Sequence, residues 1–173
     1  MPEARYRQRF PTVEGYLHHR SPYLLVDRIV QLDAEHVVTQ AVVQQESFYG
    51  QGHFPGSAIL PGALMQEMTT QSAGILIAAE YNPMQEYRTE DPMFNSHALG
   101  VLVQVQHARY RSFARPGDRL EITVRLEEAL EQVFDFQAEI RCDGKRLMQN
   151  RFRLANILSS VLQGRDLTPE SVN

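Results

Sequence analysis

Apolar and polar positions divide the chain into strand-like and helix-like stretches. Residues 24–30 and 37–43 are rich in Leu, Ile and Val, and the stretch L-D-A-E at 32–35 between them predicts a turn, so together they are expected to form a β-hairpin. Over 63–80 the apolar residues recur every three or four positions, which predicts a helix. Further strands are predicted at 98–113, 118–130, 133–140 and 146–157, with turns at 115–118 and 142–145.

The predicted helix differs from a surface helix because none of its faces is charged. Its less apolar positions carry small, uncharged residues such as Thr69, Ser72 and Gly74, and a helix without a charged face is expected to be buried. A loop rich in Gly and Pro precedes it at 49–62, and another loop follows at 81–96. A hairpin, one buried helix and a run of antiparallel strands indicate an α+β fold with the helix packed on the sheet.

Length and composition indicate one globular domain over residues 1–173. Apolar residues make up 43% of the chain and charged residues 22%, which is ordinary for a soluble protein. We expect residues 1–16 to be a peripheral lead-in, with a short helix at 13–18, and residues 158–173 to be a peripheral tail. The net charge of -4 argues against nucleic acid as the main partner.

The single cysteine, Cys142, excludes an internal disulfide and every multi-cysteine metal motif, and it fits a reducing compartment. No motif links it to a histidine, so we expect it to be inert. Adjacent side chains point apart, so His18 and His19 are expected to be structural, not metal ligands. The N-terminus has no apolar stretch of a secretory signal, and the uncharged run 47–66 contains four glycines and two prolines. We expect a cytoplasmic protein that does not insert into membranes.

Charge is almost absent around the start of the predicted helix. Of the 33 residues between Glu46 and Glu80, only Glu67 is charged, and it follows the loop residue His53 by 14 positions. A carboxyl in apolar surroundings has a raised pKa, and together with an imidazole it can provide a general acid and a general base near neutral pH. The alternatives are that His53 stabilises a turn and that Glu67 is a structural hydrogen-bond partner.

A long motif surrounds these two residues. Residues 52–71 read G-H-F-P-G-S-A-I-L-P-G-A-L-M-Q-E-M-T-T-Q. This sequence resembles the pattern G-H-F-P-G-x-x-x-x-P-G-x-L-x-x-E-x-x-x-Q of the β-hydroxyacyl-acyl carrier protein dehydratases of the FabZ type. The stretch H-R-S-P-Y-L-L-V-D-R at 19–28, and A-R-Y at 108–110 with R-P-G-D at 115–118, are similar to the same family. The resemblance covers residues 17–157.

The resemblance implies the hotdog fold, in which a sheet wraps one long helix, and a homodimer in which His53 of one chain meets Glu67 of the other. A trimer of dimers is the larger assembly that it allows. His53 would remove the C2 proton of a 3-hydroxyacyl thioester, and Glu67 would protonate the departing 3-hydroxyl to leave a trans-2-enoyl product. The amide of Gly62 would bind the thioester carbonyl, and Gln71 would orient the acid. No cofactor or metal is implied. The substrate tunnel would be lined by Phe54, Pro55, Gly56 and Pro61.

Two stretches depart from the family pattern, since 46–51 is slightly longer and 81–96 markedly longer than in typical members. Both lie near the expected entry of the acyl chain, so a specialised acyl or polyketide-like pathway is the alternative to fatty acid biosynthesis. A non-catalytic acyl-binding subunit is the alternative from another class. A hotdog thioesterase is disfavoured because the histidine and glutamate are arranged for elimination. The related FabA type carries aspartate at position 67 and also isomerises the double bond, so glutamate favours a plain dehydratase.

Basic residues gather in the C-terminal half of the chain. Acyl carrier proteins are small and strongly acidic, so an enzyme with a net charge of -4 needs a local basic surface to bind one quickly. We expect this docking surface to draw on Arg109, Arg111, Arg115, Arg119, Lys145 and Arg146. The alternative is that these side chains are only the solvated edge of the sheet.

Overall fold

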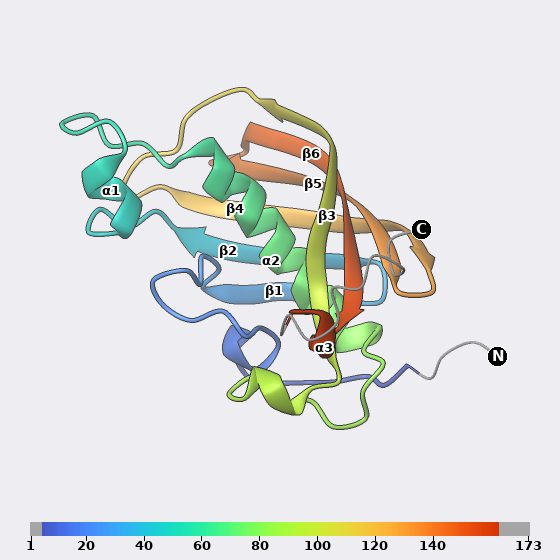
Figure 1. The fold of residues 1–173 in the computed structure, drawn as a ribbon. Helices are drawn as coiled ribbons and strands as arrows, with labels where there is room; N and C mark the ends of the chain where they lie inside the picture. Colours follow the sequence, from blue (N-terminus) through green and yellow to red (C-terminus); the bar gives the residue numbers. More distant parts are fainter. Residues whose placement is uncertain (1–4, 163–173) are drawn as a thin grey trace.

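Six strands and one long helix make up most of residues 5–162, which this computed structural model describes (Figure 1). The long helix is α2 (Gly62–Glu80). The strands are β1 (Arg28–Leu32), β2 (His36–Val42), β3 (His97–Tyr110), β4 (Arg119–Leu130), β5 (Val133–Cys142) and β6 (Lys145–Leu158). Shorter helical segments are η1 (Val13–Gly15), α1 (Phe48–Gly52), η2 (Pro92–Phe94) and α3 (Ser159–Leu162).

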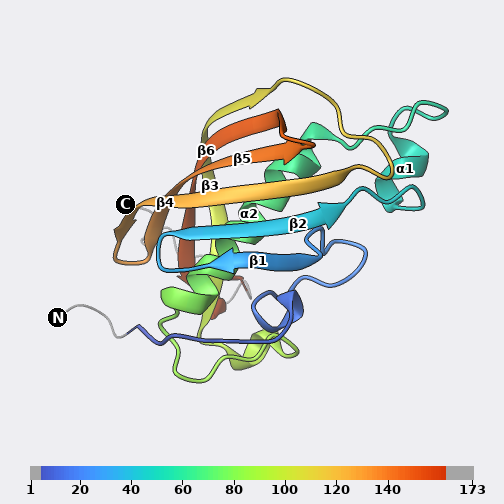
Figure 2. The same ribbon diagram turned by 180° about the vertical axis from the view of Figure 1, so that it is seen from behind.

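The strands form one antiparallel sheet in the order β1-β2-β4-β5-β6-β3. The sheet curves around α2, which lies across one of its faces (Figures 1 and 2). Buried residues alternate with more exposed ones along β2, β4, β5 and β6, as expected for strands with one covered face. The predicted α+β arrangement of one helix wrapped by an antiparallel sheet is confirmed. Among the largest fully buried side chains are Phe134, Phe136, Phe152, Ile122 and Ile140.

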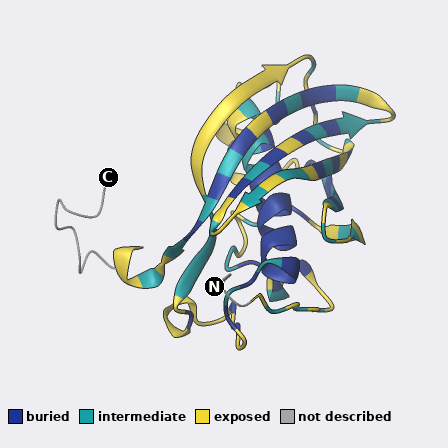
Figure 3. Cartoon of the chain, turned by 90° about the vertical axis from the view of Figure 1, so that its right-hand side faces the viewer, coloured by how far each residue is buried: buried dark blue, intermediate teal, exposed yellow. Residues whose placement is uncertain are grey.

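Helix α2 is buried along its length from residue 68 to 80, which confirms the expectation drawn from its missing charges (Figure 3). Small residues let it approach the sheet closely. A Cβ built on Gly100 of β3 would lie 3.3 Å from the Cα of Gly74, and Gly100 has a φ of 67°. On the other side the hydroxyls of Ser72 and Thr39 are 2.7 Å apart, so the buried polar groups of the helix are paired.

The prediction of a strand from residue 24 is wrong, because β1 begins only at Arg28. The cause is a side chain of α2. The Leu25 amide donates to Oε1 of Gln71 at 2.9 Å, and Nε2 of Gln71 donates to the Tyr23 carbonyl at 2.8 Å. The backbone of 23–25 therefore bonds to the helix and leaves the sheet, although Leu25 and the following Val26 are buried.

Three other boundaries differ from the prediction. The 49–62 loop opens with the helix α1, which Ser47 caps by accepting a hydrogen bond from the Gly50 amide. The helix expected at 13–18 is only the 3-10 turn η1. Strand β3 ends at Tyr110 and not at residue 113, since the chain turns toward the Leu60 amide, which donates to the Ala114 carbonyl at 2.8 Å.

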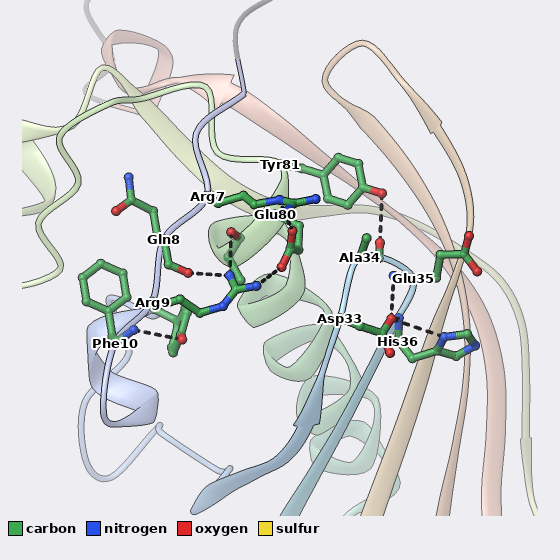
Figure 4. Close-up of polar contacts among 12 residues, drawn as sticks. Arg7, Gln8, Arg9, Phe10, Asp33, Ala34, Glu35, His36, Glu80 and Tyr81 are labelled. Carbon is green, nitrogen blue, oxygen red and sulfur yellow. Dashed lines mark hydrogen bonds and ion pairs between the residues drawn. The ribbon is translucent and has the colours of Figure 1, made fainter.

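The lead-in was expected to be peripheral, but residues 6–10 lie over the C-terminal end of α2 (Figure 4). The Glu80 side chain, only 4% exposed, is paired with Arg9 and, at 3.0 Å, with Arg7. Arg9 also donates to the Ala79 carbonyl at 3.2 Å, so a cation sits where the helix presents its free carbonyls. Residues 1–4, and 163–173 of the expected tail, lie outside the described residues.

Candidate active site

His53 directly follows α1, and its backbone amide donates to the Tyr49 carbonyl at 2.9 Å. Next comes a tight turn: the Ser57 amide donates to the Phe54 carbonyl at 2.9 Å, with Pro55 and Gly56 between them and a φ of 82° at Gly56. Nδ1 of His53 lies 3.2 Å from the Ile59 carbonyl, which can only accept a hydrogen bond. Nδ1 therefore carries the proton, and Nε2 is left with a lone pair that can take one.

A pocket of about 320 Å³ opens beside the His53 ring. Its walls come from the 53–60 loop, the first turn of α2 and the end of β3, and they are mostly apolar, as suits an acyl chain. The backbone of Gly62 packs closely against the ring of Tyr110, because a Cβ built on Gly62 would lie 3.1 Å from that ring. The pocket is lined by His53, Phe54, Ile59, Leu60, Gly62, Met65, Tyr110, Arg111, Ser112 and Phe113.

The start of α2 borders this pocket. The amides of Leu64 and Met65 both donate to the Pro61 carbonyl, at 3.0 and 3.2 Å. The Gly62 amide precedes these first bonds of the helix and is one of the donors that an α-helix leaves without an internal partner. Because Gly62 also lines the pocket, its amide and the positive end of the helix dipole can stabilise an oxyanion beside His53.

Glu67 lies in the second turn of α2 with its side chain 16% exposed. Burial raises the pKa of its carboxyl above the ordinary value, and hydrogen bonds from Gln71 and Tyr23 partly oppose this rise. Nε2 of Gln71 lies 2.9 Å from Oε1 of Glu67, one turn away along the helix. A carboxyl with a raised pKa remains partly protonated closer to neutral pH, as a general acid requires.

One chain does not bring His53 and Glu67 into the same pocket. Met65 lines the pocket beside His53, and a side chain two residues further along an α-helix points about 160° away. Glu67 accordingly contacts Tyr23 and His19 instead. The two candidate residues therefore lie on opposite sides of α2.

Sequence reasoning missed the residues that contact Glu67 from outside the helix. His18 fits the structural role expected of it, because its ring bonds to the Thr89 carbonyl and the Asn95 side chain. His19 does not point the same way: its Nε2 lies 3.6 Å from Oε1 of Glu67. The signal available in the sequence was the position of His19 and Tyr23 in the second family-like stretch, 19–28, whose function the motif alone does not state.

The six basic residues expected to dock a carrier protein lie toward one end of the sheet, where β3 and β5 end and β4 and β6 begin. Arg111 lines the His53 pocket, and Arg109 and Arg115 are exposed. Arg119 lines a separate cleft of about 620 Å³ with residues of β1, β2 and β5. Arg146 is held by Glu139 at 2.7 Å and by Gln149, so much of its charge is already neutralised, whereas Lys145 is exposed.

Within residues 5–162 there is no group of three or more His, Cys, Asp or Glu side chains that could hold a metal ion. No helix within that part of the chain is both long and apolar enough to span a membrane. Cys142 is half-buried, and burial raises the pKa of its thiol, which makes it less reactive.

Solved structures support the fold. A chain of the dehydratase heterocomplex ApeI:P from Xenorhabdus doucetiae superposes with a TM-score of 0.73 at 24% identity, covering 90% of this chain and 97% of that one. A hypothetical thioesterase with coenzyme A from Streptococcus pneumoniae matches with a TM-score of 0.55 at 16% identity, covering 76% and 85%. At these identities the likeness concerns the fold, which is the hotdog arrangement that the motif implied.

Sequence comparisons are more specific. The FabA-like domain family matches residues 17–151. The 3-hydroxyacyl-acyl carrier protein dehydratase FabZ of Dechloromonas aromatica is 31% identical over 133 residues, which are 75% of this chain and 85% of that protein. The enzyme of the same name from Syntrophobacter fumaroxidans is 35% identical over 128 residues, 73% of this chain and 79% of that one. This chain therefore belongs to the FabA-like family, and within it to the FabZ type.

Proposed function

We propose that the protein dehydrates 3-hydroxyacyl groups carried on acyl carrier protein to trans-2-enoyl groups, in fatty acid or related lipid biosynthesis in the cytoplasm. The observation that carries the proposal is the pair formed by His53, with Nε2 free to accept a proton, and Glu67, whose pKa is raised by burial. The FabZ relatives supply the substrate class through their names. The mostly apolar pocket walls fit an acyl chain.

The groups can be assigned to the steps of an elimination. Nε2 of His53 takes the proton from C2, and the electrons of that C–H bond move toward the thioester carbonyl, whose oxygen gains negative charge beside the Gly62 amide. The C2–C3 double bond forms as the C3–O bond breaks, and Glu67 gives its proton to the departing oxygen, which leaves as water. The enzyme is left with an imidazolium and a carboxylate, and transfer of one proton from His53 to Glu67 restores it.

Because one chain places the two groups on opposite sides of α2, we infer that the site is shared in a homodimer. Strand β3 is the last strand of the sheet, and among residues 5–162 no strand pairs with its outer edge, so a second copy could pair there. Residues 102–110 of this strand are all exposed in the isolated chain. Apolar side chains exposed there are Leu102, Val103, Val105 and Tyr110. A trimer of dimers is a further assembly that this arrangement allows.

The proposal is tested by incubating the protein with carrier proteins loaded with 3-hydroxyacyl groups of several chain lengths and following the loss of water by mass spectrometry. Formation of the enoyl product is the expected result, and the chain length that reacts fastest separates general fatty acid synthesis from a specialised pathway. Release of free acid would indicate a thioesterase. Binding of acyl carrier protein without turnover would indicate a non-catalytic subunit and would overturn the proposal.

Carrier docking gives a second test. Arg111 borders the pocket beside His53, and exposed Arg115 follows on the same loop, so we propose that they help to bind the acidic carrier. Reversing the charge of Arg115, which lies outside the pocket, is expected to raise KM for carrier-bound substrate about threefold at low salt, or ~0.7 kcal/mol. The defect should shrink at high salt, because screening weakens the wild-type attraction as well.

The matched control is Arg5→Glu, which changes an exposed arginine that contacts Tyr81 beyond the far end of α2. It should leave KM unchanged. Arg115 does not line the pocket, so a short pantetheine thioester, which carries no acidic protein, should react equally well with Arg115→Glu and the wild type. If Arg115→Glu impairs both substrates equally, Arg115 is structural and the docking proposal is wrong.

A further inference from the structure

The Glu67 carboxyl is surrounded by groups from two places in the chain. Gln71 comes from α2 itself, whereas His19 and Tyr23 come from residues 19–25, here called the arm. The arm lies between the turn η1 and strand β1, outside the sheet. We propose that His19 and Tyr23 are positioning residues for Glu67, and that the loop 81–96 holds them in place through His18. The proposal rests on the role of Glu67 as the general acid.

The arm is attached to the helix through the side chain of Gln71. Gln71 accepts from the Leu25 amide at 2.9 Å and donates to the Tyr23 carbonyl at 2.8 Å. The same Nε2 also contacts Oε1 of Glu67 at 2.9 Å. One amide group therefore fixes the backbone of the arm and the carboxyl of the acid relative to each other.

The surroundings of His19 determine which of its ring nitrogens is protonated. Its Nε2 faces Oε1 of Glu67, while its Nδ1 is buried and has no hydrogen-bond partner within the described part of the chain. A protonated ring would place an N–H at Nδ1 with no acceptor, which is costly for a buried group. Burial lowers the pKa of His19, in agreement with this. The neutral ring with its hydrogen on Nε2, directed at the carboxyl, is the form that fits the site.

Tyr23 completes the cluster. Its hydroxyl donates a hydrogen bond to the Glu67 carboxylate, and its ring stacks on His19 with centroids 5.9 Å apart and planes inclined by 26°. A donor to the ionised form lowers a carboxyl pKa, so the arm limits the rise that burial causes. Within residues 5–162, the titratable groups facing Glu67 are His19 and Tyr23, while α2 contributes the neutral Gln71. In the proposed dimer, His53 of the second copy would join them.

His18, next to His19, anchors the arm to the loop 81–96 through Thr89 and Asn95. Asn95 has a fixed orientation, because its Oδ1 accepts from the Arg88 amide at 3.1 Å and its Nδ2 donates to the Arg88 carbonyl at 2.6 Å. Nδ2 also lies 3.2 Å from Nε2 of His18, which must therefore accept. Nδ1 of His18 donates to the Thr89 carbonyl at 3.0 Å. A neutral imidazole satisfies both partners from the loop at once.

The loop also holds the chain on either side of the two histidines. The buried Thr89 hydroxyl donates to the Glu14 carbonyl at 2.6 Å and accepts from Arg20 at 3.2 Å. The Tyr87 hydroxyl donates to the Tyr16 carbonyl at 2.8 Å. Since these contacts flank His19 in the sequence, loss of the loop contacts should move the arm relative to Glu67.

The sharpest test removes one oxygen atom. In Tyr23→Phe, Glu67 loses a donor to its ionised form, so its pKa should rise further. The limb of the pH profile of kcat/KM that belongs to Glu67 should then move to higher pH by about half a unit. The limb that belongs to His53 should stay where it is. The matched control is Tyr81→Phe, which also removes one hydroxyl, one bonded to the Ala34 carbonyl, and should leave both limbs unchanged.

The anchor is tested at His18. His18→Leu removes both contacts with the loop and is expected to lower kcat about tenfold with little change in KM. His18→Asn keeps a donor near the position of Nδ1 and should recover part of the loss. If the leucine variant does not fold, Thr89→Val removes the hydroxyl contacts at nearly constant shape, and Thr89→Ser should restore activity.

Three outcomes separate the possibilities. A pH profile of Tyr23→Phe that coincides with that of the wild type would overturn the role of Tyr23. Wild-type kcat in the folded His18→Leu or Thr89→Val variant would overturn the anchor. Glu67→Gln serves as the reference: if it is fully active, the proposed function itself fails, whereas if it is inactive and the arm variants behave like the wild type, only the positioning proposal fails.

Discussion

Replacing His53 by alanine or Glu67 by glutamine is expected to lower kcat by about 100-fold or more, measured as enoyl formation from a carrier-bound substrate. Each variant removes one of the two proton transfers, and a positioned acid or base contributes on this scale. Alanine cannot take the C2 proton, and glutamine has no acidic proton to give to the departing hydroxyl. Activity near that of the wild type in either variant would show that the elimination does not use this pair.

Neither variant should lose activity through unfolding. His53 is half-buried beside a turn whose backbone bonds do not depend on its ring. For Glu67, folding raises the pKa, so the folded chain holds the proton more tightly than the unfolded chain, and ionisation of the buried carboxyl costs stability as the pH rises. Glutamine carries no such cost. The Tm of Glu67→Gln should match the wild type at a pH below ~4.3, the ordinary value for glutamate. It should exceed the wild type by a growing margin as the pH rises toward the folded-state pKa of Glu67, and by a constant margin above that pKa.

The main elements of the fold could be predicted because each depends on a local pattern. Helix α2 has apolar residues at helical spacing and no charged face, and Asp143 and Gly144 occupy the hairpin turn that their types favour, with φ values of 48° and 75°. The segment 24–26 was misassigned because its strand-like composition is real, but Gln71, 46 residues after Leu25, takes the amide that a neighbouring strand would bond. A contact between residues so distant in the sequence leaves no trace in the local pattern.

In the candidate site, too, some features follow from the local sequence and others only from contacts made on folding. His53 and Glu67 stand out in the sequence because charge is missing around them, and Gln71 follows Glu67 by one helical turn. His19 lies in the family-like stretch 19–28 and His18 does not, but the motif does not state which partner either ring meets. That difference arises only on folding, when His19 meets Glu67 and His18 meets Thr89 and Asn95.

The ion pair that partly neutralises Arg146 could not be predicted from the sequence either. Arg146 looks like a free cation in the sequence, but the pairing of β5 with β6 brings it next to Glu139. The strand register therefore decides which of the basic residues at this end of the sheet remain available to a carrier protein. Arg111, by contrast, keeps its place beside the His53 pocket.

The largest consequence of the opposite placement of His53 and Glu67 is that two inactive variants should restore each other. In a dimer of one His53→Ala chain and one Glu67→Gln chain, one site has lost both groups, while the other combines the intact His53 of one chain with the intact Glu67 of its partner. Equal mixing with free subunit exchange makes about half of the dimers mixed, so about a quarter of all sites should be active. The control mixes either variant with the double variant, which can form no intact site and should stay inactive. Subunit exchange is verified by the masses of differently tagged chains. If activity does not recover although exchange has occurred, or if a monomer is fully active, the whole site lies within one chain and the shared arrangement is contradicted.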